Sequence, residues 1–192
     1  MITRTRVLKG KISDTNVSQV FYRSVASLLA ADFHFEAPVL TAISNTFTVT
    51  SWHRPDDSLE IQLVEDDAMP ARWFSVVGRQ AEADHVLSIL EPQLPIWPLD
   101  ELEKKASLPA IDPGAVTRLA LGAEEYSDNT FEIIARALRS RKAEIRIAAA
   151  MATGVLRWPQ FVPGLQTAAE KEPNEAAKRV LQRALEACQG AE

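Results

Sequence analysis

Residues 144–157, "EIRIAAAMATGVLR", would place apolar side chains almost all the way round a helix. On a helical wheel, Arg146, Thr153 and Arg157 share a sector of roughly 40°, and the only other polar residue is Glu144 in the first turn. A helix with so narrow a polar stripe needs neighbours on at least two sides, and the alanines at 148, 149, 150 and 152 let those neighbours approach closely. The stretch therefore predicts an inner helix of a layered helical domain, ended by Trp158-Pro159.

Helical spacing continues on both sides of this stretch, from residue 113 to the end of the chain. The last helix keeps Leu181 and Leu185 on a single apolar stripe and gives its other face to water, as expected of the terminal layer of a stacked array. Residues typical of helix N-termini mark where the remaining helices begin. These residues are Asp112-Pro113, Asp128 or Asn129 with Glu132 as in a capping box, Pro163 in a first turn, and Asn174.

Two helix pairs in this region resemble each other. "FEIIARALRSRKAEIRIAAAMA", from Phe131, and "FVPGLQTAAEKEPNEAAKRVLQRAL", from Phe161, match at an offset of 30, and Arg146 aligns with Lys178 at an offset of 32 after a longer second loop. A repeat of about 30 residues that contains two helices is typical of a helical solenoid.

The segments "VPGLQTAAEKEPNEAAKRVLQRAL" and "AEIRIAAAMATG" resemble the HEAT and HEAT-like repeats, including the short version found in phycobilin lyases. The resemblance covers residues 128–188, with an earlier half-repeat at 113–125. It departs from the family at Ser140-Arg141-Lys142, where the family often has an acidic turn that bonds to the following arginine. The resemblance implies a helical surface for protein binding, and it does not imply a particular partner.

The N-terminal half has a different period. "NTFTVTSW" (45–52) alternates with Phe47 and Val49 on one face and threonines on the other, and "SLEIQLVE" (58–65) alternates in the same way. With the turn "HRPDDS" between them, these segments predict a β-hairpin. Two further segments predict strands, "RWFSVVG" (72–78) and the opening "ITRTRVLKGKI".

Two helices are expected beside this sheet. The first begins at Ser13-Asp14 and carries a stripe of Val17, Val20, Phe21, Val25, Leu28 and Leu29, and the second contains Val86, Ile89 and Leu90 and ends at Pro92. Residues 92–113 carry five prolines and no sustained period. The expected organisation is an α+β domain at 1–95 with a mainly antiparallel sheet and two helices, a proline-rich linker at 96–112, and an all-α HEAT-like repeat domain at 113–192.

Charge and cysteine content narrow the function classes. The net charge is −5, and residues 1–100 hold eight Lys and Arg against thirteen Asp and Glu. Such a balance disfavours nucleic acid as a partner, because nucleic-acid binding needs a concentrated positive surface. The opening "MITRTRVLKGK" lacks the features of a signal peptide, and no segment has the ~20 apolar residues that span a membrane. With Cys188 as its single cysteine, the chain is expected in a reducing, bacterial-type cytoplasm.

Catalytic signatures are not found in the sequence. The seven glycines are never closer than eight residues apart, which excludes dinucleotide fingerprints, phosphate loops and nucleophile elbows. His34, His53 and His85 lack the spacing of metal ligands. We therefore expect no catalytic residue, metal or cofactor, although a site assembled in space from distant residues stays open.

Two groups of charged residues are the candidate partner-binding sites. The acidic group divides into two clusters at opposite ends of one predicted strand, and the basic group belongs to the only concentration of positive charge. Each group is also typical of solvated turns or of surface ion pairs. The candidates are Asp56, Asp57, Glu60, Glu65, Asp66, Asp67, Arg139, Arg141 and Lys142.

These observations favour non-enzymatic protein binding. One concrete version is an immunity protein or inhibitor whose acidic surface occludes a basic partner. The alternative is an enzyme or small-molecule-binding protein with a site at the interface of the two domains. A third hypothesis, a lyase or chaperone accessory, depends on the resemblance to HEAT-like repeats alone.

Overall fold

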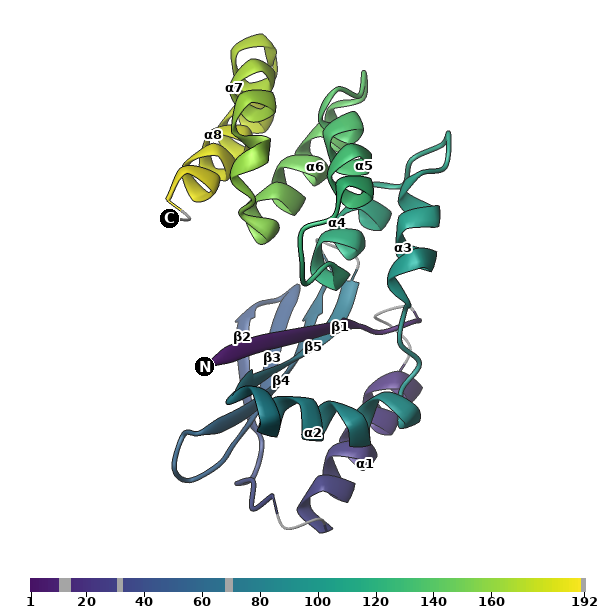
Figure 1. The fold of residues 1–192 in the computed structure, drawn as a ribbon, viewed down its shortest axis with the longest axis vertical. Helices are drawn as coiled ribbons and strands as arrows, with labels where there is room; N and C mark the ends of the chain where they lie inside the picture. Colours follow the sequence, from purple (N-terminus) through teal and green to yellow (C-terminus); the bar gives the residue numbers. More distant parts are fainter. Residues whose placement is uncertain (11–14, 31–32, 68–70, 191–192) are drawn as a thin grey trace. The chain divides into compact units, whose positions relative to one another are not determined.

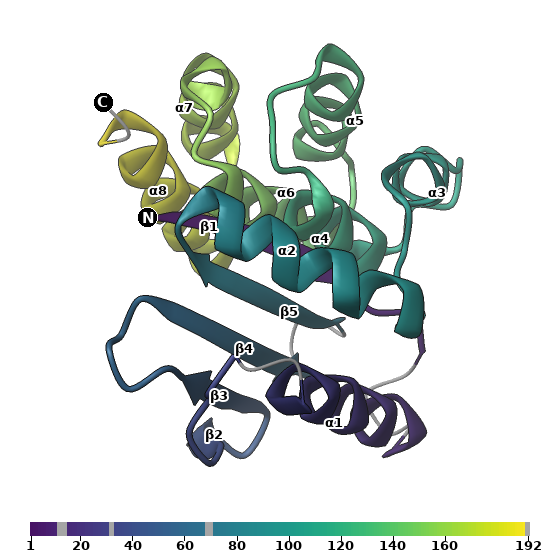
Figure 2. The same cartoon turned by 60° about the horizontal axis from the view of Figure 1, so that its bottom comes forward.

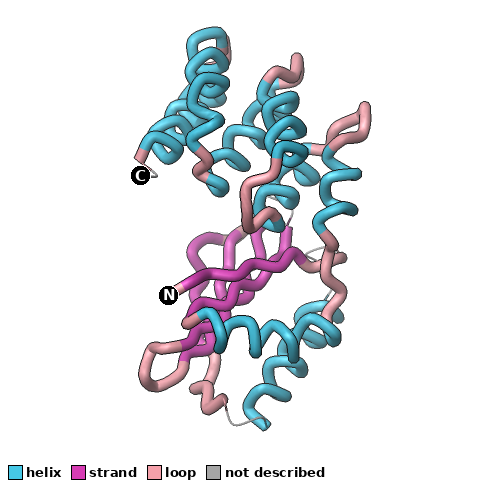
Figure 3. Tube along the Cα trace, in the orientation of Figure 1, coloured by secondary structure: helices cyan, strands magenta, loops and turns pink. Residues whose placement is uncertain are grey.

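The computed structural model describes residues 1–10, 15–30, 33–67 and 71–190. Its contacts divide the chain into two compact units, Met1–Trp97 and Pro98–Glu192, which are described separately below. The first unit contains all the strands of the described residues, and the second is built of helices (Figure 3). No helix among the described residues combines the length and the apolar character that crossing a bilayer requires.

The first unit contains an antiparallel sheet of five strands in the order β1-β5-β4-β3-β2 (Figure 1). The strands are β1 (Ile2–Val7), β2 (Val39–Ser44), β3 (Phe47–His53), β4 (Leu59–Asp66) and β5 (Ala71–Gly78). The predicted hairpin is confirmed, because β3 pairs with β4 in register from Phe47 opposite Asp66 to His53 opposite Glu60. The predictions of strands at 72–78 and at the start of the chain are also confirmed.

The sheet differs from the prediction in two places. Strand β2 was not predicted; all six of its residues are exposed, so it lacks the alternation that a half-buried strand shows. In β3, the prediction that Phe47 and Val49 form the apolar face is wrong for the helix-covered core. In β3 the buried residues are instead Thr50 and Trp52. Trp52 lies opposite Ile61, and both belong to the core that the helices cover.

Two helices cover one face of this sheet, as predicted. They are α1 (Thr15–Ala30) and α2 (Gln80–Leu90), and a single 3-10 turn, η1 (Glu91–Gln93), follows α2 at Pro92. Their buried side chains share a core with β3, β4 and β5 that includes Phe21, Trp52, Ile61, Phe74, Val86 and Leu90. The expected N-cap, Ser13-Asp14, lies outside the described residues, and Val20 of the predicted stripe is 37% exposed.

The second unit contains six helices among its described residues. They are α3 (Leu99–Ala106), α4 (Pro113–Gly122), α5 (Asp128–Leu138), α6 (Ala143–Leu156), α7 (Val162–Lys171) and α8 (Glu175–Gln189), with a 3-10 turn η2 (Pro159–Phe161) before α7. The interpretation of 96–112 as a linker without regular structure is corrected here, because it contains α3. That helix buries Leu102 and Ala106 on one side, and eight residues are too few for a sequence period to stand out.

These helices form two rows (Figure 2). Helix α6 packs between α4 and α8 in one row, and α5 lies between α3 and α7 in the other. The prediction of an inner alanine-rich helix is confirmed, because Ala149, Ala150 and Ala152 are completely buried. Thr153 is buried as well and does not face water as the wheel suggested; its hydroxyl donates to the carbonyl oxygen of Ala150 (2.8 Å).

The helix caps largely follow the sequence signals. The side chains of Asp112 and Asn174 accept hydrogen bonds from backbone N–H groups in the first turns of α4 and α8. For α5 the expected cap is corrected, because Ser127 accepts from the N–H of Thr130 and precedes both Asp128 and Asn129. All three residue types are good caps, so the sequence could not choose between neighbouring positions.

Candidate functional site

The first acidic cluster lies in and beside the turn between β3 and β4. Asp56 accepts hydrogen bonds from the hydroxyl (2.7 Å) and backbone N–H (3.1 Å) of Ser58, which lower the pKa of that carboxyl. Arg54 lies 3.5 Å from Asp56 and donates to Glu82 (2.8 Å). Glu60 accepts from the side chain of Gln62 (2.6 Å). Local contacts therefore hold Asp56 and Glu60, while Asp57 is exposed in the turn with φ 52°.

The second acidic cluster lies at the other end of β4. Glu65 accepts from Arg72 (2.7 Å), whose side chain is 2% exposed, and from the hydroxyl of Ser18 on α1 (3.0 Å). Asp66 is buried, whereas Asp67 is exposed. The structure thus places the acidic candidates in two separate clusters. Arginines within the unit already neutralise part of their charge, which weakens the field available to a basic partner.

The three histidines of the first unit belong to different segments of the chain. His53 is 3.6 Å from Glu60 at the end of β3, and His85 on α2 contacts the ring of Phe33 at 5.3 Å. His34 lies in the segment before β2 with φ 53°. In the described part of the chain, no three His, Cys, Asp or Glu residues gather closely enough to hold a metal ion.

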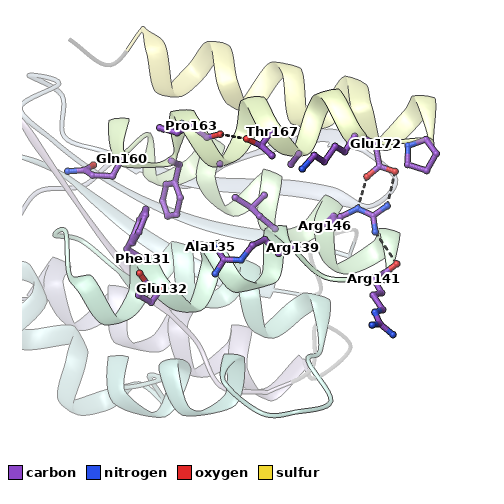
Figure 4. A pocket seen from close by; sticks show the side chains of 16 residues that line it. Phe131, Glu132, Ala135, Arg139, Arg141, Arg146, Gln160, Pro163, Thr167 and Glu172 are labelled. Atoms are coloured by element: carbon purple, nitrogen blue, oxygen red, sulfur yellow. Dashed lines mark hydrogen bonds and ion pairs between the residues drawn. The ribbon is translucent and has the colours of Figure 1, made fainter.

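A groove in the second unit brings together residues that are far apart in the sequence (Figure 4). It has a volume of about 740 Å³ and runs between the outer helices α5 and α7. Its walls follow the helical period, with Phe131 and Ala135 of α5 and the C-cap residue Arg139 on one side and Gly164 and Lys171 of α7 on the other. Phe131 and Arg139 are eight positions apart, which corresponds to about 12 Å along the helix axis at 1.5 Å per residue.

One end of the groove is basic. Arg139 and Arg141, two of the three basic residues that the sequence singled out, line it together with Lys171, and all three side chains are exposed. None of these three side chains forms an ion pair with a described residue. Lys142, the third basic candidate, is the N-cap residue of α6 and does not line the groove.

A buried ion pair joins the helix pairs beneath this basic end. Arg146 donates from Nε (2.6 Å) and Nη2 (2.8 Å) to the two carboxylate oxygens of Glu172, whose side chain is fully buried. This bond lowers the pKa of Glu172 and raises the pKa of Arg146. A third guanidinium nitrogen, Nη1, donates to the carbonyl oxygens of Ser140 (2.9 Å) and Arg141 (3.0 Å).

The carboxylate that binds Arg146 therefore comes from the turn after α7, and the turn at Ser140-Arg141-Lys142 supplies only carbonyl groups. Glu172 was missed from the sequence, because its partner lies 26 residues away and the helix stacking decides which side chains meet. A usable signal in the sequence was Glu172 itself, which lies 30 positions after Lys142, in the turn between α7 and α8, whereas the turn between α5 and α6 has no acid.

The other end of the groove is aromatic. Phe131 and Phe161 line it with ring centroids 4.9 Å apart, and Trp158 stacks on Phe161 at 5.8 Å with an interplanar angle of 3°. Tyr126 contacts Trp158 at 4.9 Å and is 44% exposed. The partly exposed rings of this cluster offer an apolar surface beside the groove.

Small residues keep the middle of the groove open. A methyl group built at Gly164 would meet only Leu138 Cδ1, at 4.0 Å, so the backbone of α7 leaves free space there. Ala135 and Ala168 line the same stretch. A Cβ atom at position 164 is therefore accommodated without displacing a neighbour.

Comparisons with protein-family models, with curated proteins and with solved structures found no match.

Proposed function

We propose that this chain is a non-enzymatic protein-binding module and that the groove between α5 and α7 is its binding site. The observation that carries the proposal is the division of the groove into an aromatic end and a basic end, with small residues between them. Ligand sites in proteins are concave, mostly apolar and supplied with a few well-placed polar groups. The HEAT-like resemblance of the helices supports protein binding on this surface.

The groove fits a segment that carries an apolar anchor and acidic side chains about 12 Å apart. The partly exposed ring of Phe131, supported from behind by the buried ring of Phe161, would contact the anchor, because buried aromatic contacts supply much of the energy of interfaces. Arg139, Arg141 and Lys171 would bind the carboxylates, because none of them is paired among the described residues. The proposed partner is therefore acidic at its contact, in place of the basic partner that the acidic clusters had suggested.

We also propose that the chain is located in the cytoplasm, and this proposal depends on its single cysteine. Cys188 is buried, and burial raises the pKa of its thiol, so the reactive thiolate is disfavoured. Its Sγ donates to the carbonyl oxygen of Thr153 (3.4 Å). A cytoplasmic location, where thiols stay reduced, suits this residue.

A selection from a random 12-residue peptide library tests the proposal with a defined probe. The full chain is immobilised, and peptides that also bind the Gly164→Leu variant are removed, because leucine at this position fills the groove. We expect the remaining peptides to combine an aromatic or large aliphatic residue with acidic residues. Their spacing should be three to four residues in extended peptides or about eight in helical ones.

Binding of a selected peptide is then measured by titration calorimetry. Two variants should each weaken binding at least about tenfold. Gly164→Leu removes a buried contact of the peptide by filling the groove, and the double variant Arg139→Ser, Lys171→Ser removes two charged contacts. Gln166→Leu on the exposed side of α7 is the matched control and should leave binding unchanged. Affinity should fall between about 50 and about 500 mM salt, because charge attraction is screened. Failure to select acidic peptides, or equal binding by Gly164→Leu, contradicts the proposal.

A further inference from the structure

The two edges of the five-stranded sheet differ in how they are protected. At the β1 edge, Arg6 pairs with Glu91 (2.6 Å) and Arg4 with Asp84 (3.6 Å), so charged side chains flank the strand. The chain after α2 also covers the end of this strand, because Trp97 donates its N–H to the carbonyl oxygen of Val7 (2.9 Å). Charge and cover of this kind keep an edge from pairing with another chain.

The β2 edge has neither protection. Strand β2 pairs with β3 on one side only, and within the described residues no strand lies on its other side. Val39, Leu40 and Ile43 are 56%, 67% and 63% exposed, which makes β2 the largest group of exposed aliphatic side chains in the first unit. Residues 37–46 contain no charged side chain, and no proline lies within β2. An uncharged, apolar edge of this kind favours pairing with another strand.

We propose that β2 pairs with β2 of a second copy of this chain, antiparallel across a twofold axis, so that two five-stranded sheets join into one. A register centred on Thr41 places Val39 opposite Ile43 of the second copy and Leu40 opposite Ala42. The two Thr41 side chains then lie opposite each other. Aliphatic and Thr–Thr cross-strand pairs of this kind stabilise antiparallel sheets.

The sequence of β2 favours a copy of the chain over a foreign strand. Residues 37–46 carry no charge, so two copies, each with a net charge of −5, can approach there without bringing like charges into contact. A foreign strand added to an edge is usually selected by pockets for its alternate side chains. Strand β2 is exposed on both faces and has none, whereas a twofold pair needs only a self-complementary segment. The bulge at Ile43, between Ala42 and Ser44, lies at the end of this register and leaves its centre, residues 40–42, regular for pairing.

Sedimentation velocity of the full chain over about 1 to about 100 µM tests this proposal, because a dimer is favoured by mass action. Wild type should shift from monomer to dimer with concentration. Thr41→Lys and Thr41→Glu should each raise the dimer dissociation constant at least about tenfold, because like charges then face each other across the axis. An equimolar mixture of the two variants should restore the dimer, because opposite charges meet.

Gln182→Lys and Gln182→Glu on the exposed face of α8 are the matched controls and should dimerise as wild type does. Circular dichroism shows that each variant is folded, which is expected because Thr41 is exposed. A wild-type chain that stays monomeric throughout the series overturns the proposal and leaves the edge to a strand of another protein. Dimers that tolerate both Thr41 variants overturn it as well.

Discussion

Replacing Glu172 by glutamine is expected to lower the free energy of unfolding of the helical unit by about 3 kcal/mol, because the mostly buried side chain of Arg146 loses its counter-ion. Glutamine keeps the shape of the side chain, but its amide group turns a donor toward the donors of Arg146. Urea denaturation at pH 7, followed by circular dichroism, measures the loss. Hydrogen exchange should accelerate in α6, α7 and α8 more than in the sheet.

The control for this variant is Glu170→Gln, which makes the same change on an exposed residue two positions earlier, in the last turn of α7. It should alter the free energy of unfolding by no more than about 0.5 kcal/mol. An equal effect of the two substitutions would show that the ion pair contributes nothing specific to stability.

The ion pair also predicts how stability depends on pH. Because Arg146 holds the pKa of Glu172 below its usual range in the folded chain, the unfolded chain takes up this proton at a higher pH than the folded chain does. The stabilisation is complete above the unfolded pKa of about 4.3 and is lost as the pH falls through the lower folded pKa. The difference in unfolding free energy between wild type and Glu172→Gln should therefore shrink below about pH 4. A difference that stays constant down to pH 3 would contradict this assignment.

Replacing Phe21 by alanine is expected to cost about 4 kcal/mol in the first unit. Phe21 is completely buried, and its ring lies 5.7 Å from that of Trp52 and 5.2 Å from that of Phe74, so the substitution opens a cavity between α1 and the sheet. Because a domain is stable by only about 5 to 15 kcal/mol, part of the population should be unfolded at physiological temperature. Urea denaturation followed by tryptophan fluorescence measures the effect, since Trp52 loses a neighbour.

Val20→Ala, one residue away on the same helix, is the control for Phe21→Ala. Val20 is 37% exposed, and alanine is the better helix former, so this change should be close to neutral. A loss below about 1.5 kcal/mol in Phe21→Ala would mean that the core between α1 and the sheet is not packed as described.

Most predictions that depend on neighbouring residues agreed with the structure, with the N-cap of α5 and the buried face of β3 as exceptions. The caps at Asp112 and Asn174, the inner position of Ala149 and the β3–β4 hairpin were all read from patterns a few residues long. Periodicity reports whether one face of an element is buried, and this signal fails where no face is buried. For this reason β2, exposed on both sides, was missed.

The candidate site was only partly predictable. Arg139 and Arg141 stood out as part of a concentration of positive charge, and both line the groove. No sequence pattern marked Gly164 and Lys171 as groove residues. They line the groove from α7, and which residues of α7 do so is decided only when α7 packs beside α5. The sequence offset of about 30 matches the two helix pairs, but it does not predict the depth of the groove. That depth depends on the volumes of the side chains that pack between the helices.

What the sequence by itself determined is the set of elements: a period-two half, a helical half, and the residues that begin and end most of the helices. Only the tertiary structure decided which face of β3 is covered by helices, which carboxylate neutralises Arg146, and where a groove opens between α5 and α7. The physical reason is the distance along the sequence over which each interaction acts. Capping and periodicity act over about four residues, whereas packing joins residues such as Arg146 and Glu172 that lie 26 positions apart.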